Sequence, residues 1–136
     1  MRITEPLKKN YEFRRLYSKG QCFSDSYLAV YCRKTKRRDN RLGITVGKRV
    51  GNAVQRNRLR RRIRESYRLM EPEMNTGFEI VVVGRVRAAG SDYHRISASL
   101  RKLLTKQGVL REKGSDAREE GTAGAHAVLP EEHIPG

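Results

Sequence analysis

The sequence has no long apolar run and no obvious targeting segment. No stretch approaches the roughly 18 consecutive apolar residues of a membrane span. The first residues, MRITEPLKKNYEF, lack the apolar core of a secretory signal peptide. These absences favour a cytoplasmic protein with no membrane partner. The length of 136 residues predicts one domain, with room for a tail.

Residues for metal or acid–base chemistry are also scarce. Cys22 and Cys32 are too far apart for a C-x-x-C pair, so we expect free thiols. The three histidines have no zinc-type spacing: His94, His126 and His133. Seven acids follow the first predicted helix and precede the tail, and they form no cluster: Asp25, Asp39, Glu65, Glu71, Glu73, Glu79 and Asp92. The sequence therefore predicts no catalytic group and no metal site in the protein itself.

Positive charge, by contrast, is abundant and concentrated in one part of the chain. The formal net charge is +15, and residues 33–68 hold 15 basic and 2 acidic residues, a net charge of +13. Such crowding of like charge destabilises a fold unless a polyanion offsets it. Because the basic block has an apolar periodicity, we expect a folded nucleic-acid-binding face and not a disordered basic tail.

The periodicity of apolar residues predicts three helices and at least three strands. Helices are expected over residues 10–20, with Asn10 as N-cap, over 53–69, and from a Ser91 cap to Gly108. Strands are expected over 27–33, 41–46 and 78–83, with a short one near residues 22–23. The two strands that flank the second helix can be parallel. This order, α-β-β-β-α-β-α, favours a two-layer α/β (α+β) sandwich with a central sheet.

The second helix has two faces of opposite character. Asn52 is its expected N-cap, and Gln55 completes a capping box. One stripe carries Leu59, Ile63, Tyr67 and Met70, which are expected in the core. The opposite side lacks acidic partners and predicts a phosphate-binding face: Asn57, Arg60, Arg61, Arg64 and Arg68.

Four aromatic residues and one turn each allow two interpretations, a structural role or a role in RNA binding. Phe13, Tyr17, Tyr27 and Tyr31 can belong to the core, or they can stack on bases beside a basic groove. Tyr17 and Tyr31 carry polar tips, which favours partial exposure. Residues 47–51 resemble a phosphate-cradling loop but match neither nucleotide-binding glycine pattern. They are expected to form a tight turn whose N–H groups can still meet an RNA phosphate.

The chain divides into a domain over residues 1–110 and a tail over 111–136. The tail is rich in Gly and Glu with scattered apolar residues. It has too little to bury, and we expect it to be disordered.

The stretch RLGITVGKRVGNAVQRNRLRRRIRE, from Arg41 to Glu65, resembles the signature of the bacterial ribonuclease P protein family. The similarity extends upstream to Phe13, Tyr17 and Gly20, and downstream to the strand FEIVVVGR. It covers residues 7–107. The resemblance implies an α/β sandwich with a left-handed βαβ crossover, a fold also found in a domain of a small-subunit ribosomal protein. This handedness opposes the general rule for such units.

The resemblance also implies function and partners. The family assembles with a catalytic RNA to remove the 5′ leader of precursor tRNA, with Mg²⁺ held mainly by the RNA and the substrate. No obligate protein partner is implied. The residues implied to bind RNA are Lys48, Arg49, Arg56, Asn57, Arg58, Arg60, Arg61, Arg64 and Arg68. Those implied to line the leader cleft are Phe13, Tyr17 and Tyr31. A ribosomal or chaperone-type RNA-binding protein and a DNA-binding domain are the alternatives.

Overall fold

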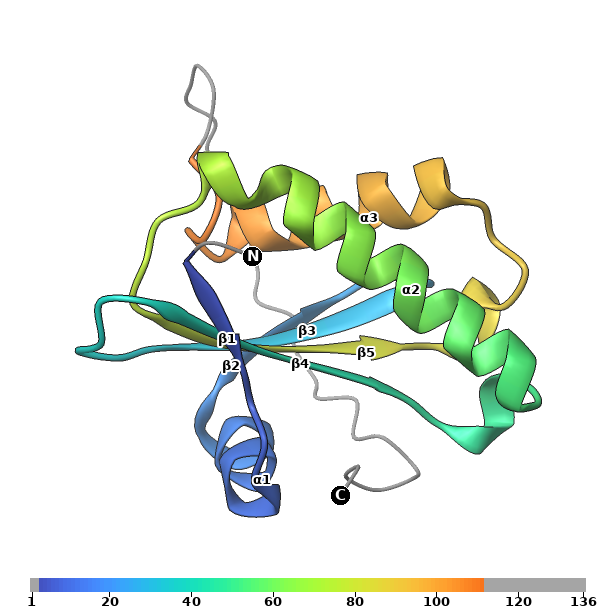
Figure 1. Ribbon diagram of the computed structural model, residues 1–136, viewed down its shortest axis with the longest axis horizontal. Helices are drawn as coiled ribbons and strands as arrows, with labels where there is room; N and C mark the ends of the chain where they lie inside the picture. Colours follow the sequence, from blue (N-terminus) through green and yellow to red (C-terminus); the bar gives the residue numbers. More distant parts are fainter. Residues whose placement is uncertain (1–2, 112–136) are drawn as a thin grey trace.

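The computed structural model describes residues 3–111, which form one five-stranded sheet with three α-helices (Figure 1). The strands are β1 (Thr4–Pro6), β2 (Gln21–Ser24), β3 (Leu28–Lys34), β4 (Asn40–Val46) and β5 (Phe78–Gly84). The helices are α1 (Asn10–Lys19), α2 (Ala53–Met70) and α3 (Tyr93–Lys106). Three short 3-10 turns are η1 (Lys48–Val50), η2 (Glu71–Glu73) and η3 (Val86–Ala88).

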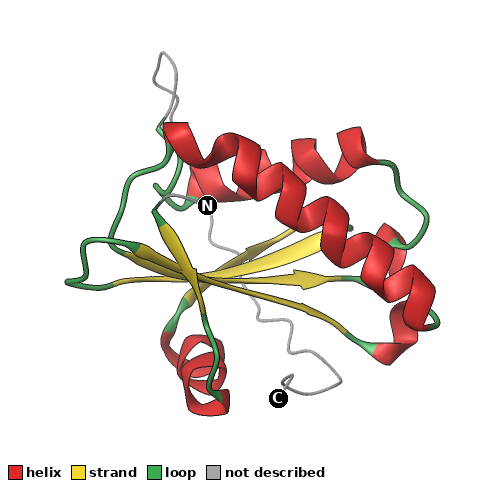
Figure 2. Ribbon diagram, viewed as in Figure 1, coloured by secondary structure: helices red, strands yellow, loops and turns green. Residues whose placement is uncertain are grey.

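The strands lie in the order β1-β4-β5-β3-β2. β4 is parallel to its neighbours β1 and β5, while β3 is antiparallel to β5 and β2. Helix α2 joins the parallel strands β4 and β5, which confirms the predicted βαβ unit. The left-handed sense of this crossover connection stays a prediction. Helices α2 and α3 cover one face of the sheet, and α1 lies against the other (Figure 2). The sandwich therefore has a third, partial layer.

Helices cover both faces because the central strands are apolar on both faces. On β3, Leu28, Val30 and Cys32 belong to the large cluster under α2 and α3, whereas Ala29 and Tyr31 belong to the smaller cluster under α1. The sequence predicts Tyr27, Ala29 and Tyr31 on one face of this strand and Leu28, Val30 and Cys32 on the other, and this alternation is confirmed from Leu28 onward. The structure places the half-buried Cys22 against the α1 cluster, on the opposite face from Cys32, and both thiols are free.

Capping explains where the helices begin, and here two predictions were wrong. Helix α1 has Lys9 as N-cap, with Asn10 inside the helix, and the Glu12 carboxylate accepts the backbone N–H groups of Lys8 and Lys9. Helix α3 is capped by Asp92, not Ser91, through an Asp92 oxygen that accepts the Arg95 N–H at 2.9 Å. Lys9 makes no side-chain hydrogen bond as the cap of α1, whereas Asp92 satisfies an orphan N–H group in the first turn of α3.

The capping box of α2 is present as predicted. Asn52 Oδ1 accepts the Gln55 N–H, and Gln55 Oε1 accepts the Asn52 N–H, both at 2.9 Å. The helix extends to Met70, one residue beyond the expected end. The beginning of the Arg-rich helix is therefore fixed by its own sequence.

Strand β1 was not predicted. It has three residues and ends in a proline, so it carries almost no strand signal. Its position depends on contacts with distant residues. The Ile3 N–H donates to Glu71 Oε2 at 3.1 Å, and the hydroxyls of Thr4 and Tyr67 share a hydrogen bond of 2.9 Å. The beginning of the chain is thus attached to the end of α2.

Within residues 3–111, no helix is long and apolar enough to span a bilayer. The domain boundary is compatible with the contacts near residue 110, because Val109 and Leu110 are buried and Leu110 bridges to Met74. Residues 112–136, and with them the prediction of a disordered tail, lie outside the described part of the chain.

Asn40 gives a direct test of the packing between the ends of β4 and β5. Its fully buried amide accepts the Phe78 N–H at 2.9 Å and donates to the Asn75 carbonyl at 3.1 Å. Asn40→Ala leaves both groups unpaired and should reduce the free energy of unfolding in urea by about 1–3 kcal/mol. Asn75→Ala, the matched control, removes an exposed amide and its hydrogen bond to the Gly108 carbonyl, and should cost about 0.5 kcal/mol, the low end of the range for a hydrogen bond. Equal losses would contradict this role for Asn40.

Candidate nucleic-acid interface

Helix α2 exposes its arginines because its opposite stripe is buried. Leu59, Ile63, Tyr67 and Met70 are all at most 2% exposed and pack against the sheet and α3, as the sequence predicts. The helix is therefore held rigidly along its length. Its polar side is free to present charge to a ligand.

The carboxylates of the domain are paired mainly with other basic residues. Six ion-paired acids take partners elsewhere or at the end of α2: Glu12–Arg41, Asp25–Lys102, Asp39–Arg37, Glu65–Arg68, Glu73–Arg101 and Glu79 with both Arg15 and Arg33. Within residues 3–111, four predicted RNA-binding residues have neither an ion pair nor a side-chain hydrogen bond: Lys48, Arg58, Arg61 and Arg64. Their charges are available to a polyanion.

Three further predicted residues are ordered by local hydrogen bonds. Arg56 Nε donates to the Gly51 carbonyl at 3.0 Å, which fixes the side chain across the turn before α2. Arg60 Nη1 donates to Asn57 Oδ1 at 2.9 Å, one turn apart on the helix surface. Burial, with the positive charges of Arg56 and Arg64, lowers the pKa of Arg60. Like charges are crowded here without an acid to offset them.

Arg68, at the other end of α2, differs from the rest of the predicted set. Both of its guanidinium contacts reach Glu65, with the shorter at 2.6 Å, so a charge that the sequence assigned to the binding face is already paired. Arg62 had no assigned role. It lies on the flank of α2 and donates through Nη1 to the Ser91 carbonyl at 2.7 Å.

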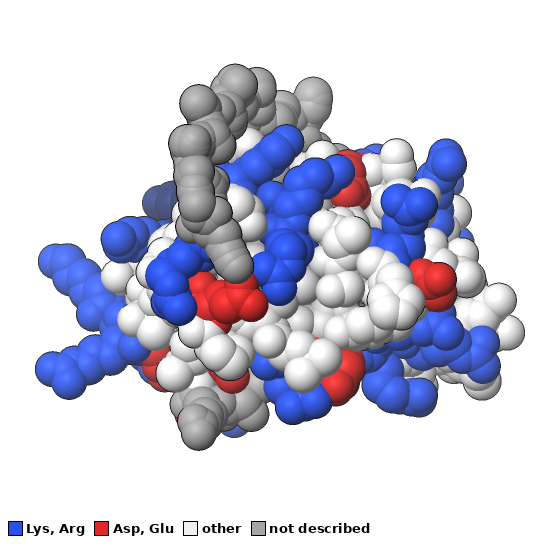
Figure 3. All heavy atoms as spheres, turned by 90° about the horizontal axis from the view of Figure 1, so that it is seen from above, with Lys and Arg blue, Asp and Glu red and all other residues white. Residues whose placement is uncertain are grey.

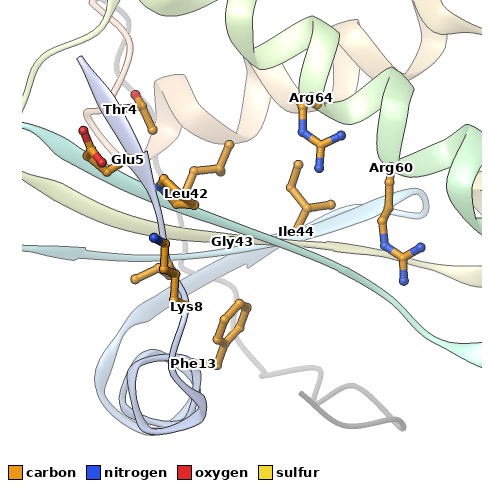
Figure 4. Close-up of a pocket in the computed structure, with 11 residues that line it drawn as sticks. Thr4, Glu5, Lys8, Phe13, Leu42, Gly43, Ile44, Arg60 and Arg64 are labelled. Carbon is orange, nitrogen blue, oxygen red and sulfur yellow. The ribbon is translucent and has the colours of Figure 1, made fainter. Parts of the chain in front are cut away.

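A pocket of about 580 Å³ opens at the edge of the sheet where β1 ends (Figure 4). Arg60 and Arg64 extend toward it from α2, and Phe13 approaches from α1 on the other side of β4. Lys8 and Ile44 complete the lining on the side of the strands. The pocket therefore joins two groups of residues that the sequence analysis treated separately, the basic helix face and part of the aromatic set.

The aromatic residues are more buried than expected. Phe13 is 3% exposed and Tyr31 only 1%, so the predicted partial exposure of Tyr31 was wrong. The reason is helix α1, which covers this face of β3. Tyr17 is half-buried, as predicted, and its ring meets that of Tyr31 edge-on, with centroids 5.0 Å apart.

The Tyr17 hydroxyl lies at an incompletely satisfied position. Burial raises the pKa of Tyr17 to about 12, and nearby Thr45 offsets part of the rise. The hydroxyl has no hydrogen bond of good geometry to any described residue. Tyr17 and Tyr31 do not line the pocket at the sheet edge; they lie beside Phe13 in the cluster under α1. The hydroxyl itself is buried, so only the exposed part of the Tyr17 ring is accessible to a ligand.

The described residues offer cations but no metal site. Within residues 3–111, no three His, Cys, Asp or Glu side chains lie close enough together to hold a metal ion. On the face that carries α2 and α3, Lys and Arg side chains clearly outnumber Asp and Glu (Figure 3). The arrangement can bind and orient phosphate groups, and it does not resemble a protein centre for phosphodiester cleavage.

Comparison with known proteins agrees with this chemistry. The family model described as ribonuclease P matches residues 1–108. A ribonuclease P protein component from Natranaerobius thermophilus is 40% identical over 105 residues, which are 77% of this chain and 91% of that protein. The solved ribonuclease P protein of Staphylococcus aureus aligns with a TM-score of 0.72 and 34% identity, covering 78% of this chain and 97% of that one.

A second solved structure, the ribonuclease P protein of Thermotoga maritima, aligns with a TM-score of 0.69 and 30% identity, over 75% of this chain and 96% of that one. This chain belongs to the ribonuclease P protein family. It acts as the protein subunit of a ribonucleoprotein endoribonuclease in the 5′ maturation of tRNA, with catalysis based in the RNA. The resemblance seen in the sequence is confirmed, and the ribosomal alternative is not favoured.

The two kinds of arginine should respond differently to truncation. Arg64 has no partner within residues 3–111, so Arg64→Ala should change the free energy of unfolding by no more than about 0.5 kcal/mol. Arg15→Ala, the matched control, removes a 3.2 Å contact to the buried Glu79 and should cost about 1–2 kcal/mol, a range reduced for its partial exposure. Urea unfolding measures the loss of stability in both variants. A larger loss for Arg64→Ala than for Arg15→Ala would show that Arg64 stabilises the fold.

Proposed function

We propose that α2 and the η1 turn bind the catalytic RNA through phosphate contacts. The observation that carries this proposal is the set of guanidinium groups without acidic partners on a rigidly packed helix. Planar guanidinium forks suit phosphate oxygens, and each bound phosphate releases counterions. The phosphate contacts come from Lys48, Arg58, Arg61 and Arg64. Arg56 and Arg60 are already held in place by local hydrogen bonds and add to the same surface. Arg49 and Asn57 complete the face, whereas Arg68 contributes less because Glu65 holds it.

The 5′ leader of precursor tRNA occupies the pocket at the sheet edge and continues along the side of α1. Leu7 N–H donates to the Leu42 carbonyl at 2.9 Å, so the backbone of Leu42 faces β1. By the alternation of a strand, the N–H and C=O of Ile44 face the same way, beyond the end of β1. A base edge can bond to them while a phosphate meets Arg60 or Arg64. Tyr17, half-buried on α1, offers the exposed part of its ring for stacking farther along.

The protein assists cleavage without supplying the catalytic metal. Residues 3–111 bring together no acids that fit a Mg²⁺ site, and in this proposal the Mg²⁺ that the reaction needs is held by the RNA and the substrate. Fixed positive charge on α2 offsets the repulsion between two polyanions at the place where they meet. Because its relatives are bacterial and its substrate is a transcript, we place the chain in the cytoplasm.

Reconstitution tests this function. A 5′-labelled precursor tRNA is incubated with the protein, with the ribonuclease P RNA of the same genome, and with both, across a series of Mg²⁺ concentrations. The mixture should cleave at lower Mg²⁺ than the RNA alone, and the advantage should shrink as salt rises, because salt screens the charges of the protein. Protein freed of RNA should not cleave.

Two results would contradict the proposal. Specific 5′ cleavage by RNA-free protein would require a protein active site. An unchanged Mg²⁺ requirement in the mixture would mean that the protein does not assist this RNA.

The leader site is tested on α1, which offers a matched pair of tyrosines. Tyr17→Ala should weaken binding of the assembled enzyme to precursor tRNA by about 5–150-fold, the range for losing one stacked base. Binding to mature tRNA should stay nearly constant. Tyr11→Ala, which removes a 57% exposed ring six residues earlier, should leave both affinities nearly unchanged. Equal losses for both ligands would show that Tyr17 supports the fold or the RNA contact instead.

A further inference from the structure

A second group of cations surrounds Tyr27, away from the binding face assigned above. The guanidinium carbon of Arg95 lies 5.2 Å from the centroid of the Tyr27 ring, and that of Arg87 lies 5.8 Å away. Both distances fall within the range of cation–π contacts. One aromatic ring thus holds two arginines that come from different elements, η3 and the first turn of α3.

The ring itself is firmly placed. Asp25 Oδ1 accepts the N–H groups of Tyr27 and Leu28, each at 2.9 Å, and the Tyr27 carbonyl accepts the Arg85 N–H at 2.9 Å. The sequence alternation placed Tyr27 on the face of Ala29 and Tyr31, but its ring packs against the cluster under α2 and α3. Since β3 begins only at Leu28, Tyr27 does not follow the alternation of the strand.

Neither arginine is neutralised. Arg87 and Arg95 are exposed, and within residues 3–111 neither guanidinium makes an ion pair or a hydrogen bond. Asp92 is the nearest acid in sequence to Arg95, and its carboxylate accepts the backbone N–H of that residue at the N-terminus of α3. A guanidinium stacked on a ring keeps its N–H edge free, so both groups remain able to bind an anion.

This group lies next to the established basic face. The η3 turn contacts the η1 turn, which carries Lys48, and Arg62 of α2 donates to the Ser91 carbonyl just before α3. The beginnings of α2 and α3 lie at the same end of the molecule (Figure 1). An RNA strand on α2 can therefore continue over η3 without leaving positive surface.

We propose that Tyr27, Arg87 and Arg95 form a clamp for an RNA backbone phosphate, which extends the α2 binding face over the beginning of α3. The inference rests on the proposed function, because the ligand is the ribonuclease P RNA. The tyrosine acts as a positioning residue. It restricts two flexible side chains before binding, so less conformational entropy is lost when the phosphate is held.

The experiment measures affinity for the ribonuclease P RNA of the same genome over a salt series, using the full chain. Arg87→Ala/Arg95→Ala should make the slope of log affinity against log salt shallower by about 0.7–0.9, because the clamp holds one phosphate and one phosphate contact contributes about that much. The charge-matched control is Lys36→Ala/Lys106→Ala, at the other end of the molecule, and its slope should change by less than half as much.

Tyr27→Leu separates the clamp from general electrostatics, since it removes the ring and leaves the net charge unchanged. It should weaken RNA binding several-fold, whereas Tyr27→Phe should bind like the wild type. Thermal unfolding of each variant identifies any loss of RNA affinity that comes from misfolding. Tyr27→Phe keeps the aromatic ring and nearly the same side-chain volume, so it tests whether the ring alone is sufficient.

The outcomes distinguish the two proposals. If the wild type binds and Arg87→Ala/Arg95→Ala matches its control, the clamp is overturned and the α2 face stands. If the arginine pair matters but folded Tyr27→Leu binds like the wild type, positioning by the ring is overturned. If the wild type itself does not bind this RNA, the proposed function fails, and the clamp fails with it.

Discussion

The domain depends on where its few carboxylates lie among many guanidinium groups. Glu79, almost fully buried, pairs with Arg15 of α1 and Arg33 of β3, and so ties the helix to the sheet. Glu12 performs the same function with Arg41. Burial alone would raise the pKa of Glu12, but the N–H groups of Lys8 and Lys9 and the nearby Arg41 outweigh it, so this pKa lies below its usual value. Because the acids stabilise the α1 side, α2 is left with unbalanced charge.

That imbalance is tolerated because packing, not charge, holds α2 in place. Its apolar stripe is buried from Leu59 to Met70, and the capping box fixes where the helix begins. Like-charge repulsion along the exposed side therefore cannot readily unwind the helix. The same repulsion becomes a source of affinity when phosphates arrive, since binding then relieves a cost that the free protein already carries.

The sequence could predict α2 almost completely, because its caps, its core stripe and its arginines are all encoded within 18 residues. It could not predict β1, whose position depends on Glu71 and Tyr67 far along the chain. The analysis of the sequence also missed that Arg68 is paired while Arg64 has no partner within residues 3–111, although the i,i+3 spacing of Glu65 and Arg68 permits such a pair. The burial of Tyr31 depends on α1 docking, and the Tyr27 group on a turn that breaks the strand alternation. Local pattern determines elements, whereas pairing between distant elements determines which charges remain available.

Under the proposed function, the pocket at the sheet edge lets one small domain contact two RNA molecules. β1 stops at Pro6, whereas β4 continues to Val46, so the edge of β4 becomes open where α2 passes above it. Arg60 and Arg64 consequently belong to two surfaces, the charged side of α2 and the wall of the pocket. Under that proposal, a substrate in the pocket and a catalytic RNA on the helix meet at the same two arginines. The protein needs no reactive group of its own for this task, because holding both polyanions against a rigid cationic element shortens the search for the reacting geometry.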